Sequence, residues 1–311
     1  MHPVNRLLLF VFVAFLFTVS LAGTRETARI AEERQVIRIA HANWTSSVAS
    51  ANLARAVFQE KLGMDCELVP MGIDEIWEAL AGGEVDAMLS AWLPDTHAHF
   101  MEQFGGEVVD LGPNLTGTRT GLVVPDLQPG RLRAGPGIHE SYITIDSIAE
   151  IRAHADKFDH RIIGIEREAG ITRQTRKARE AYGLENFVLV EGTEREMIDA
   201  LLNAILQEKW VVITGWEPHW SFARWSLKFL DDPLNIYGDE GRIHTIVRIG
   251  LENDLPEAFR FLDNFHWSPE EMGQLMLWIE EDKGRFPYDK ALRWMRTNPD
   301  RVRKWMPGEG F

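Results

Sequence analysis

The chain has 311 residues, of which 45% are hydrophobic and 26% are charged, as in an ordinary globular protein. Its formal net charge of −14 argues against nucleic-acid binding, which needs clustered Lys and Arg. The single cysteine, Cys66, excludes an intrachain disulfide, and its strand-like flanks favour a small buried hydrophobe over a reactive thiol. The unusual figure is 11 Trp beside 4 Tyr, which is more than packing alone requires.

Residues 1–23 have the pattern of a secretory signal peptide. A basic start (1–6) precedes a continuous apolar run (7–17), and small residues at 20–23 offer a cleavage site. The apolar run is short for a membrane span of about 20 residues, and an uncleaved anchor is the alternative interpretation. No Cys lies near the cleavage site, so a lipid anchor is not expected. The sequence therefore predicts an exported, periplasmic protein.

Strand and helix patterns alternate along the chain from residue 36. Strands are expected at 36–40, 67–69, 85–91, 120–124, 161–165, 187–190, 211–214 and 243–249. Helices are expected at 47–62, 74–81 (capped by Asp74), 96–104 (capped by Asp95 or Thr96), 147–158, 172–182 and 193–209, and the chain after 249 reads as helical. Capping boxes begin two of them, at Ser147 and Thr193. This order predicts an α/β fold with parallel-rich sheets flanked by helices.

The alternation has two centres, which predicts two lobes with a ligand cleft between them. Lobe one is expected to comprise 36–123 together with 222–311, and lobe two 124–221. A cleft between two such lobes is a natural place for a small-molecule site.

Three of the expected strands run straight into tryptophan. These strands lead to Trp44, Trp92 and Trp216. Ligands of α/β folds bind at strand ends, and three indole faces suit a quaternary ammonium cation. Core packing is the alternative interpretation for each, and it is the expected one for Trp220 and Trp225.

Two further features fit an anion beside such a cation. His97 follows Trp92 by five residues, near the start of a helix, where it could donate a hydrogen bond. Gly170 and Ile171 link a strand to a helix whose first N–H groups are free to bind an anion. A metal site at Asp95, His97 and His99 is not expected, because histidines two apart on a helix do not share a face.

Catalytic and cofactor motifs are not found in the sequence. No G-x-S-x-G, H-E-x-x-H, G-x-G-x-x-G after a strand, or Walker A pattern occurs. His41 and His219 lie beside candidate Trp residues and are interpreted as structural. The chain is therefore expected to be a binding protein, without a cofactor, rather than an enzyme.

Taken together, these segments resemble the substrate-binding proteins of glycine betaine/proline betaine/choline ABC transporters, over about residues 36–306. The segments that carry the resemblance are Ala-Asn-Trp (42–44), Ala-Trp-Leu-Pro-Asp-Thr-His (91–97), Val-Asp-Leu-Gly-Pro-Asn (109–114), Thr-Gly-Leu-Val-Val-Pro (120–125), Gly-Ile-Glu (164–166), Ala-Gly-Ile (169–171), Thr-Gly-Trp-Glu-Pro-His-Trp (214–220), Phe-Leu-Asp-Asp-Pro (229–233) and Asp-Asn-Phe (263–265). In this order and spacing, the segments are highly specific for this family.

The resemblance implies a two-lobed, type II-like periplasmic binding protein that closes on its ligand. It implies that Trp44, Trp92 and Trp216 surround a trimethylammonium group, while the N–H groups of Gly170 and Ile171 and the side chain of His97 hold a carboxylate. The implied partners are a betaine-type ligand and a membrane permease, and the implied state is a monomer. The alternative is an extracytoplasmic sensor or binding module for choline, carnitine or another small cation.

One segment departs from the family pattern. Arg167 and Glu168 stand where members usually have Pro-Gly, so two charges are expected near the anion site. Residues 130–143 also look longer and richer in Gly and Pro than is usual. The sequence leaves open which of glycine betaine, proline betaine, carnitine or a sulfonium analogue is bound.

Overall fold

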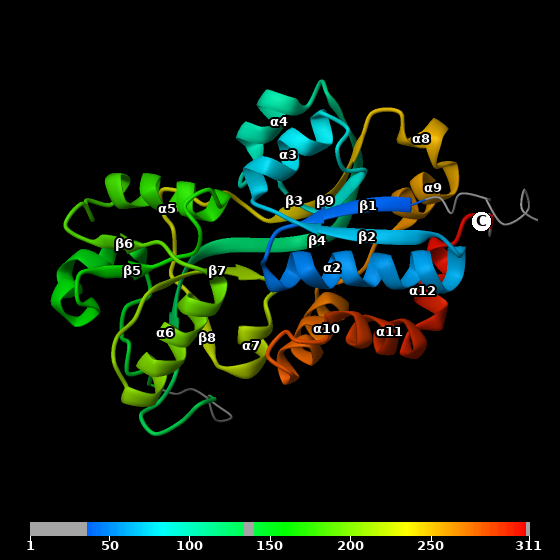
Figure 1. Cartoon of the computed structure of the whole chain (residues 1–311). Helices are drawn as coiled ribbons and strands as arrows, with labels where there is room; N and C mark the ends of the chain where they lie inside the picture. The colour runs from blue at the N-terminus through cyan, green and yellow to red at the C-terminus, as the bar shows by residue number, and fades with distance from the viewer. Residues whose placement is uncertain (1–35, 134–139, 309–311) are drawn as a thin grey trace, which may run out of the picture. The chain divides into compact units, whose positions relative to one another are not determined.

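The long strand β4 (Val108–Pro125) connects two groups of strands. The computed structural model describes residues 36–133 and 140–308, so the expected signal peptide at 1–23 and part of the segment 130–143 lie outside the described residues. The strand order is β2-β1-β3-β9-β4-β7-β5-β6, and β8 pairs with β4 beside this path. In Figure 1, β4 runs from the strands of the first group to those of the second.

The two strand groups flank β4 on either side. The first contains β1 (Val36–His41), β2 (Asp65–Pro70), β3 (Ala87–Leu93) and β9 (Gly241–Arg248); the second contains β5 (Arg161–Ile163), β6 (Val188–Val190), β7 (Ile213–Glu217) and β8 (Leu227–Phe229). The pairs β1/β3, β5/β6 and β5/β7 are parallel, whereas β9 and β4 pair antiparallel with their neighbours. The expected α/β fold is confirmed, and the antiparallel centre is an addition made by long-range pairing.

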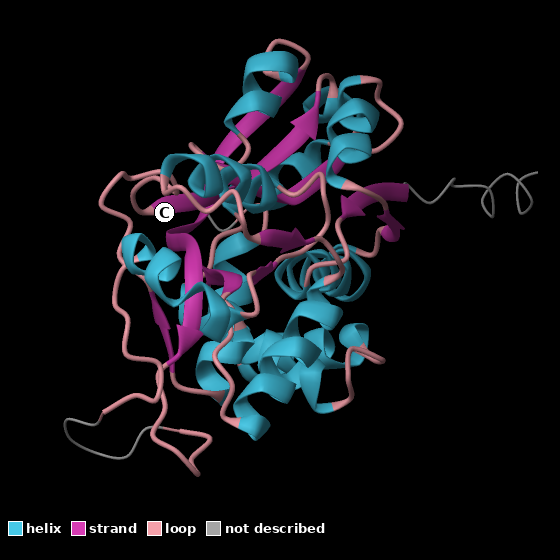
Figure 2. Ribbon diagram, turned by 90° about the vertical axis from the view of Figure 1, so that its left-hand side faces the viewer, coloured by secondary structure: helices cyan, strands magenta, loops and turns pink. Residues whose placement is uncertain are grey.

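Helices lie on both sides of the strands (Figure 2). They are α2 (Thr45–Val57), continued by the π-helical turn η1 (Phe58–Leu62), α3 (Ile73–Ala81), α4 (Ala98–Phe104), the 3₁₀ helix η2 (Ile148–Phe158), α5 (Gly170–Ala181), α6 (Glu194–Gln207), α7 (Trp220–Arg224), α8 (Leu251–Asp254), α9 (Pro256–Asn264), α10 (Pro269–Glu281), α11 (Pro287–Thr297) and α12 (Pro299–Trp305). Among the described residues, no helix is long and apolar enough to cross a membrane.

Local sequence signals explain several helix ends. The Ser147 hydroxyl accepts a hydrogen bond from the amide of Ala149, and the Thr193 hydroxyl accepts one from the amide of Glu196, so both expected capping boxes form. The helical run that starts with α2 ends at Gly63, whose φ of 64° is left-handed and favours glycine.

Two expected caps are wrong. Gly72 precedes α3 as its N-cap, and Asp74 lies in the first turn, 3.6 Å from the guanidinium of Arg173. Helix α4 starts after His97, and neither Asp95 nor Thr96 caps it. The carboxylate of Glu75 accepts the amide of Gly72 at the start of α3, and the turn before α4 is closed by hydrogen bonds between His97 and Trp92 of β3.

The core is continuous and rich in aromatic rings. Trp294 and Trp305 stack at 5.9 Å, and both are fully buried, as is Trp77. Trp220 and Trp225 are buried as expected, and burial raises the pKa of the Cys66 thiol to about 12, which fits a packing role. The chain from Ile37 onward forms one compact unit, and its division into lobes at 124 and 222 stays a prediction.

Candidate functional site

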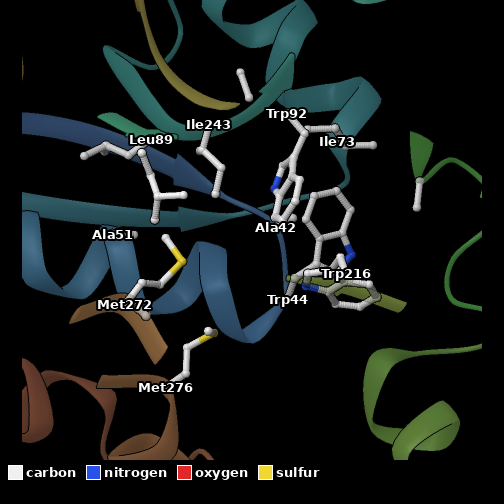
Figure 3. Close-up of a cluster of buried hydrophobic side chains, with 14 of the residues drawn as sticks. Ala42, Trp44, Ala51, Ile73, Leu89, Trp92, Trp216, Ile243, Met272 and Met276 are labelled. Carbon is white, nitrogen blue, oxygen red and sulfur yellow. The ribbon is translucent and has the colours of Figure 1, made fainter. Parts of the chain in front are cut away.

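One cavity brings together all six residues singled out from the sequence. Its empty volume is about 330 Å³ including the mouth, and it is lined by Trp44, Ser46, Trp92, Thr96, His97, Thr120, Ile165, Ala169, Gly170, Ile171 and Trp216. We call Trp44, Trp92 and Trp216 the Trp box, and Gly170, Ile171 and His97 the anion site. Figure 3 shows the three indoles of the Trp box gathered beside Ala42 and Ile73. Segments 172 residues apart in sequence thus line the same space, from Trp44 to Trp216.

The Trp box is built from two strands and the start of a helix. Trp92 and Trp216 are the second-last residues of β3 and β7, while Trp44 follows β1 by three residues and is the N-cap of α2. Their exposed fractions are 7% for Trp44, 6% for Trp92 and 5% for Trp216. Rings that are almost removed from water offer their faces to a cation at low dielectric, where the attraction is strongest.

The carboxylate of Glu166 fixes the indole of Trp44. The indole Nε1 of Trp44 donates a hydrogen bond to Oε2 of Glu166, which follows β5, at 3.0 Å. Burial raises the pKa of Glu166, and the negative charges of Glu194 and Glu168 raise it further, while the Trp44 bond opposes this. Trp44 therefore has a directional partner that lies 122 residues away in sequence.

Glu194, the first residue of α6, binds the next residue along from Trp44. Its Oε2 accepts the amide N–H of Thr45 at 2.9 Å, and its Oε1 accepts the Thr45 hydroxyl. Oε1 also accepts a hydrogen bond from Nε2 of His219 at 3.0 Å. The ring of His219 packs edge-on against Trp216 at 4.9 Å. The buried carboxylate of Glu194 thus links the segment that carries Trp44 to the segment that carries Trp216.

Hydrogen bonds stabilise the charge of Glu194 in its buried position. Burial by itself would raise the pKa of this carboxyl group, but the bonds from His219 and Thr45 hold it below its usual value. The amide of Ser221 donates to Nδ1 of His219 at 3.1 Å, so the ring proton of a neutral His219 lies on Nε2 and points to Glu194. These contacts fit the structural role that the sequence predicts for His219.

His97 is held by the backbone of Trp92. The amide of Trp92 donates to Nδ1 of His97 at 3.0 Å, and the amide of His97 donates to the carbonyl of Trp92 at 2.8 Å. Burial lowers the pKa of His97 to about 3, with smaller contributions in the same direction from His99 and Arg173. The ring is therefore neutral near pH 7 and carries its proton on Nε2, which leaves an N–H for an anion.

The start of α5 forms the second part of the anion site. Among the described residues, no hydrogen bond uses the amide N–H groups of Gly170 or Ile171, as is usual at the first positions of a helix. A Cβ atom on Gly170 would lie 2.2 Å from the carbonyl oxygen of Thr96. Glycine is therefore required for α5 to approach the turn after Trp92 this closely.

The two unusual charges before α5 turn away from the cavity. Arg167 and Glu168 are exposed, and neither lines the site. Nε of Arg167 bonds Oε2 of Glu191 at 2.9 Å, which balances its charge outside the anion site. The concern raised by the sequence, that Arg167 and Glu168 enter the anion site, does not apply to their side chains.

The model of the family described as the substrate binding domain of the ABC-type glycine betaine transport system matches residues 35–297. The chain belongs to this family. Among solved structures, a glycine betaine, L-proline ABC transporter binding protein (ProX) from Borrelia burgdorferi is 33% identical, with a TM-score of 0.80 over 88% of this chain and 98% of the other.

Two further members of this glycine betaine family extend the comparison. Lactococcal OpuAC, in a closed conformation complexed with glycine betaine, is 34% identical, with a TM-score of 0.78 over 88% of this chain and 99% of the other. The glycine betaine/carnitine transport binding protein GbuC of Listeria monocytogenes is 42% identical over 155 residues, which are 49% of this chain. That match spans about half, 51%, of the Listeria protein.

Sequence reasoning missed several polar residues in and behind the walls of the cavity. Glu166 and Glu194 do not line it, and Ser46, Thr96 and Thr120 line it without having been singled out. Glu166 directly follows a predicted strand, which is a signal that could have found it. Glu194 sits inside a capping box like many surface acids, so only its tertiary contacts distinguish it. Within the described residues, no group of three or more His, Cys, Asp or Glu could hold a metal ion.

Proposed function

We propose that this protein binds glycine betaine, or a closely related betaine, outside the cytoplasm and delivers it to an ABC permease. The observation that carries the proposal is the convergence of three buried indoles, two free helix N–H groups and a neutral His97 on one cavity. A quaternary ammonium has no N–H to donate, so ring faces and shape must recognise it. The anion site then distinguishes a betaine, which has a carboxylate, from choline, which lacks one.

The expected binding energies are consistent with this assignment. Each desolvated Trp face contributes on the order of 1–2 kcal/mol, so three contribute roughly 3–6 kcal/mol. Micromolar affinity requires about 8 kcal/mol in total. Charge-assisted hydrogen bonds from the anion site to the carboxylate, together with apolar contact, supply the difference. No single group is sufficient, and the loss of one should be measurable.

The proposed cycle is binding, closure and release, without covalent chemistry. We expect the regions that carry Trp44 and Trp216 to move apart in the empty protein and to close on the ligand, as in hinged binding proteins. The protein acts as a monomer, and residues 1–23 direct its export to the periplasm. Identical dimensions in X-ray scattering with and without saturating ligand would contradict closure.

A fluorescence titration tests the ligand. Purified protein lacking residues 1–23 is titrated with glycine betaine, proline betaine, carnitine, choline and a sulfonium betaine, with Trp emission as the signal and calorimetry as the second method. We expect micromolar binding of at least one carboxylated member and at least tenfold weaker binding of choline. The proposal fails if no member of the panel binds with a Kd below about 1 mM.

A further inference from the structure

Of the three box indoles, Trp44 is the one whose N–H is bound by a charged side chain. Its Nε1 donates to Oε2 of Glu166 at 3.0 Å, and the two residues lie 122 positions apart in sequence. The described residues provide no comparable bond to Nε1 of Trp92 or Trp216. Glu166 does not itself line the cavity, so its influence on a bound molecule passes through the Trp44 ring and through space.

Placing a carboxylate here is unfavourable in the empty protein. Glu166 is half-buried, and two of the groups that face it, Glu194 and Glu168, are also acidic. The nearest arginine in sequence, Arg167, is already paired with Glu191. A neutral amide would accept the indole hydrogen bond without the desolvation and repulsion that a charge brings. A cation inside the Trp box attracts the Glu166 carboxylate and so offsets this desolvation and repulsion.

A charged acceptor also changes what the ring can do. A hydrogen bond to a carboxylate is shorter and stronger than one to an amide, so it fixes the plane of the indole more firmly. Negative charge at the edge of the ring adds to the negative potential of its face, which is the surface that attracts an ammonium group. At reduced dielectric, this attraction extends across the width of one ring.

We propose that Glu166 is a positioning and selectivity residue of the Trp box, whose charge makes the cavity prefer a cationic headgroup over a neutral headgroup of the same shape. The proposal rests on the proposed function, because it presumes that a betaine occupies the cavity. It concerns selection of a charged headgroup beyond the selection that the quadrupoles of the three indoles provide by themselves.

The test compares glycine betaine with 3,3-dimethylbutanoate, in which carbon replaces the quaternary nitrogen. The two ligands share shape and carboxylate and differ by one positive charge. Glycine betaine affinity is measured by calorimetry, and dimethylbutanoate affinity by its displacement of betaine. In Glu166→Gln we expect betaine binding to weaken five- to twentyfold, while dimethylbutanoate binding is unchanged or stronger.

Matched variants separate charge from structure. Glu168→Gln removes an equal charge two residues away, at an exposed side chain, and should leave both affinities within twofold. Glu166→Asp keeps the charge and shortens the side chain. We therefore expect both ligands to bind more weakly, while the ratio of their affinities stays within threefold of its value in the unaltered protein. This variant also decides the matter if Glu166→Gln fails to fold.

Two results would overturn the proposal. One is an equal weakening of both ligands in Glu166→Gln, which would make the residue merely structural. The other is a fall of fivefold or more in the ratio of betaine affinity to dimethylbutanoate affinity in Glu166→Asp, where the charge is kept. If the unaltered protein binds neither ligand, the proposed function itself fails; if it binds betaine and Glu166→Gln leaves the ratio unchanged, only the role of Glu166 fails.

Discussion

The Trp box and the anion site line the same cavity but are built by different means. The box consists of side chains from β3, β7 and the start of α2, and the carboxylates of Glu166 and Glu194 bind Trp44 and Thr45. The anion site is mostly backbone, made of two free amides and one buried ring whose tautomer is set by the Trp92 amide. Replacing one Trp removes only that ring's share of the binding energy. Binding at the anion site depends instead on how closely the start of α5 approaches the turn before α4. Substitutions should therefore act differently on the two parts.

The largest effect is expected at Gly170. In Gly170→Ala, the added methyl group meets the Thr96 carbonyl oxygen at 2.2 Å, so α5 must move away from the turn before α4. We expect glycine betaine affinity, measured by calorimetry, to fall at least a hundredfold. Gly273→Ala, within α10, has no atom within 4 Å of the new Cβ and should bind normally. Near-normal affinity of Gly170→Ala would show that the anion site tolerates a wider approach.

Removing one wall of the box should have the next largest effect. Trp92→Ala deletes one of three ring faces, and we expect glycine betaine affinity to weaken at least tenfold while the fold survives. The control is Trp278→Ala, which removes a half-buried indole outside the cavity, stacked under Arg293 at 4.0 Å. Calorimetry measures both. An unchanged affinity in Trp92→Ala would remove this residue from the box.

A smaller effect on affinity is expected from the support behind the box. Glu194→Gln places an amide where His219 and Thr45 donate, so at least one donor loses its acceptor and unfolding free energy falls by about 1–3 kcal/mol. Glycine betaine affinity should weaken several-fold, because the Trp44 and Trp216 segments are no longer linked. Asp199→Asn, at an exposed position of the same helix, is the control. Chemical denaturation and calorimetry measure the two quantities, and a loss of affinity without loss of stability would contradict the linking role.

The smallest effect concerns pH at the anion site. A His with an ordinary pKa near 6.5 would gain a charge on acidification and bind a carboxylate more tightly, but the pKa of His97 is lowered to about 3. Glycine betaine affinity should therefore change less than twofold between pH 8 and pH 5, measured in Glu166→Gln so that the nearby carboxyl does not titrate. Tighter binding below pH 6.5 would show that His97 becomes charged.

The same lowered pKa affects folding in a defined direction. The unfolded chain takes up a proton on His97 below about pH 6.5, whereas the folded chain does so only near pH 3. The unfolded state thus binds more protons in this window, and stability falls as the pH decreases from 6.5 towards 3, by up to about 1.4 kcal/mol per pH unit. Replacing His97 by Gln should flatten this part of the stability profile in denaturant titrations at several pH values.

Much of the fold follows from local patterns in the sequence. The capping boxes at Ser147 and Thr193 form as expected, and Gly63 ends its helical run. Strand β4 was predicted only at 120–124, because its part from Val108 to Thr118 is held by pairing with β9, more than a hundred residues later. The caps expected at Asp74 and Asp95 failed for another reason, since nearby side chains fix those helix starts, Glu75 at Gly72 and His97 at Trp92.

The sequence by itself determined which residues to examine. The strands that lead to Trp44, Trp92 and Trp216 can be identified, as can His97 and the Gly170–Ile171 turn, because chain direction and helix-start chemistry are local properties. Only the tertiary structure decided that they share one cavity, that His97 is neutral, and that Glu166 and Glu194 bind Trp44 and Thr45. Burial and long-range hydrogen bonds set these features, and both depend on segments that the sequence keeps far apart.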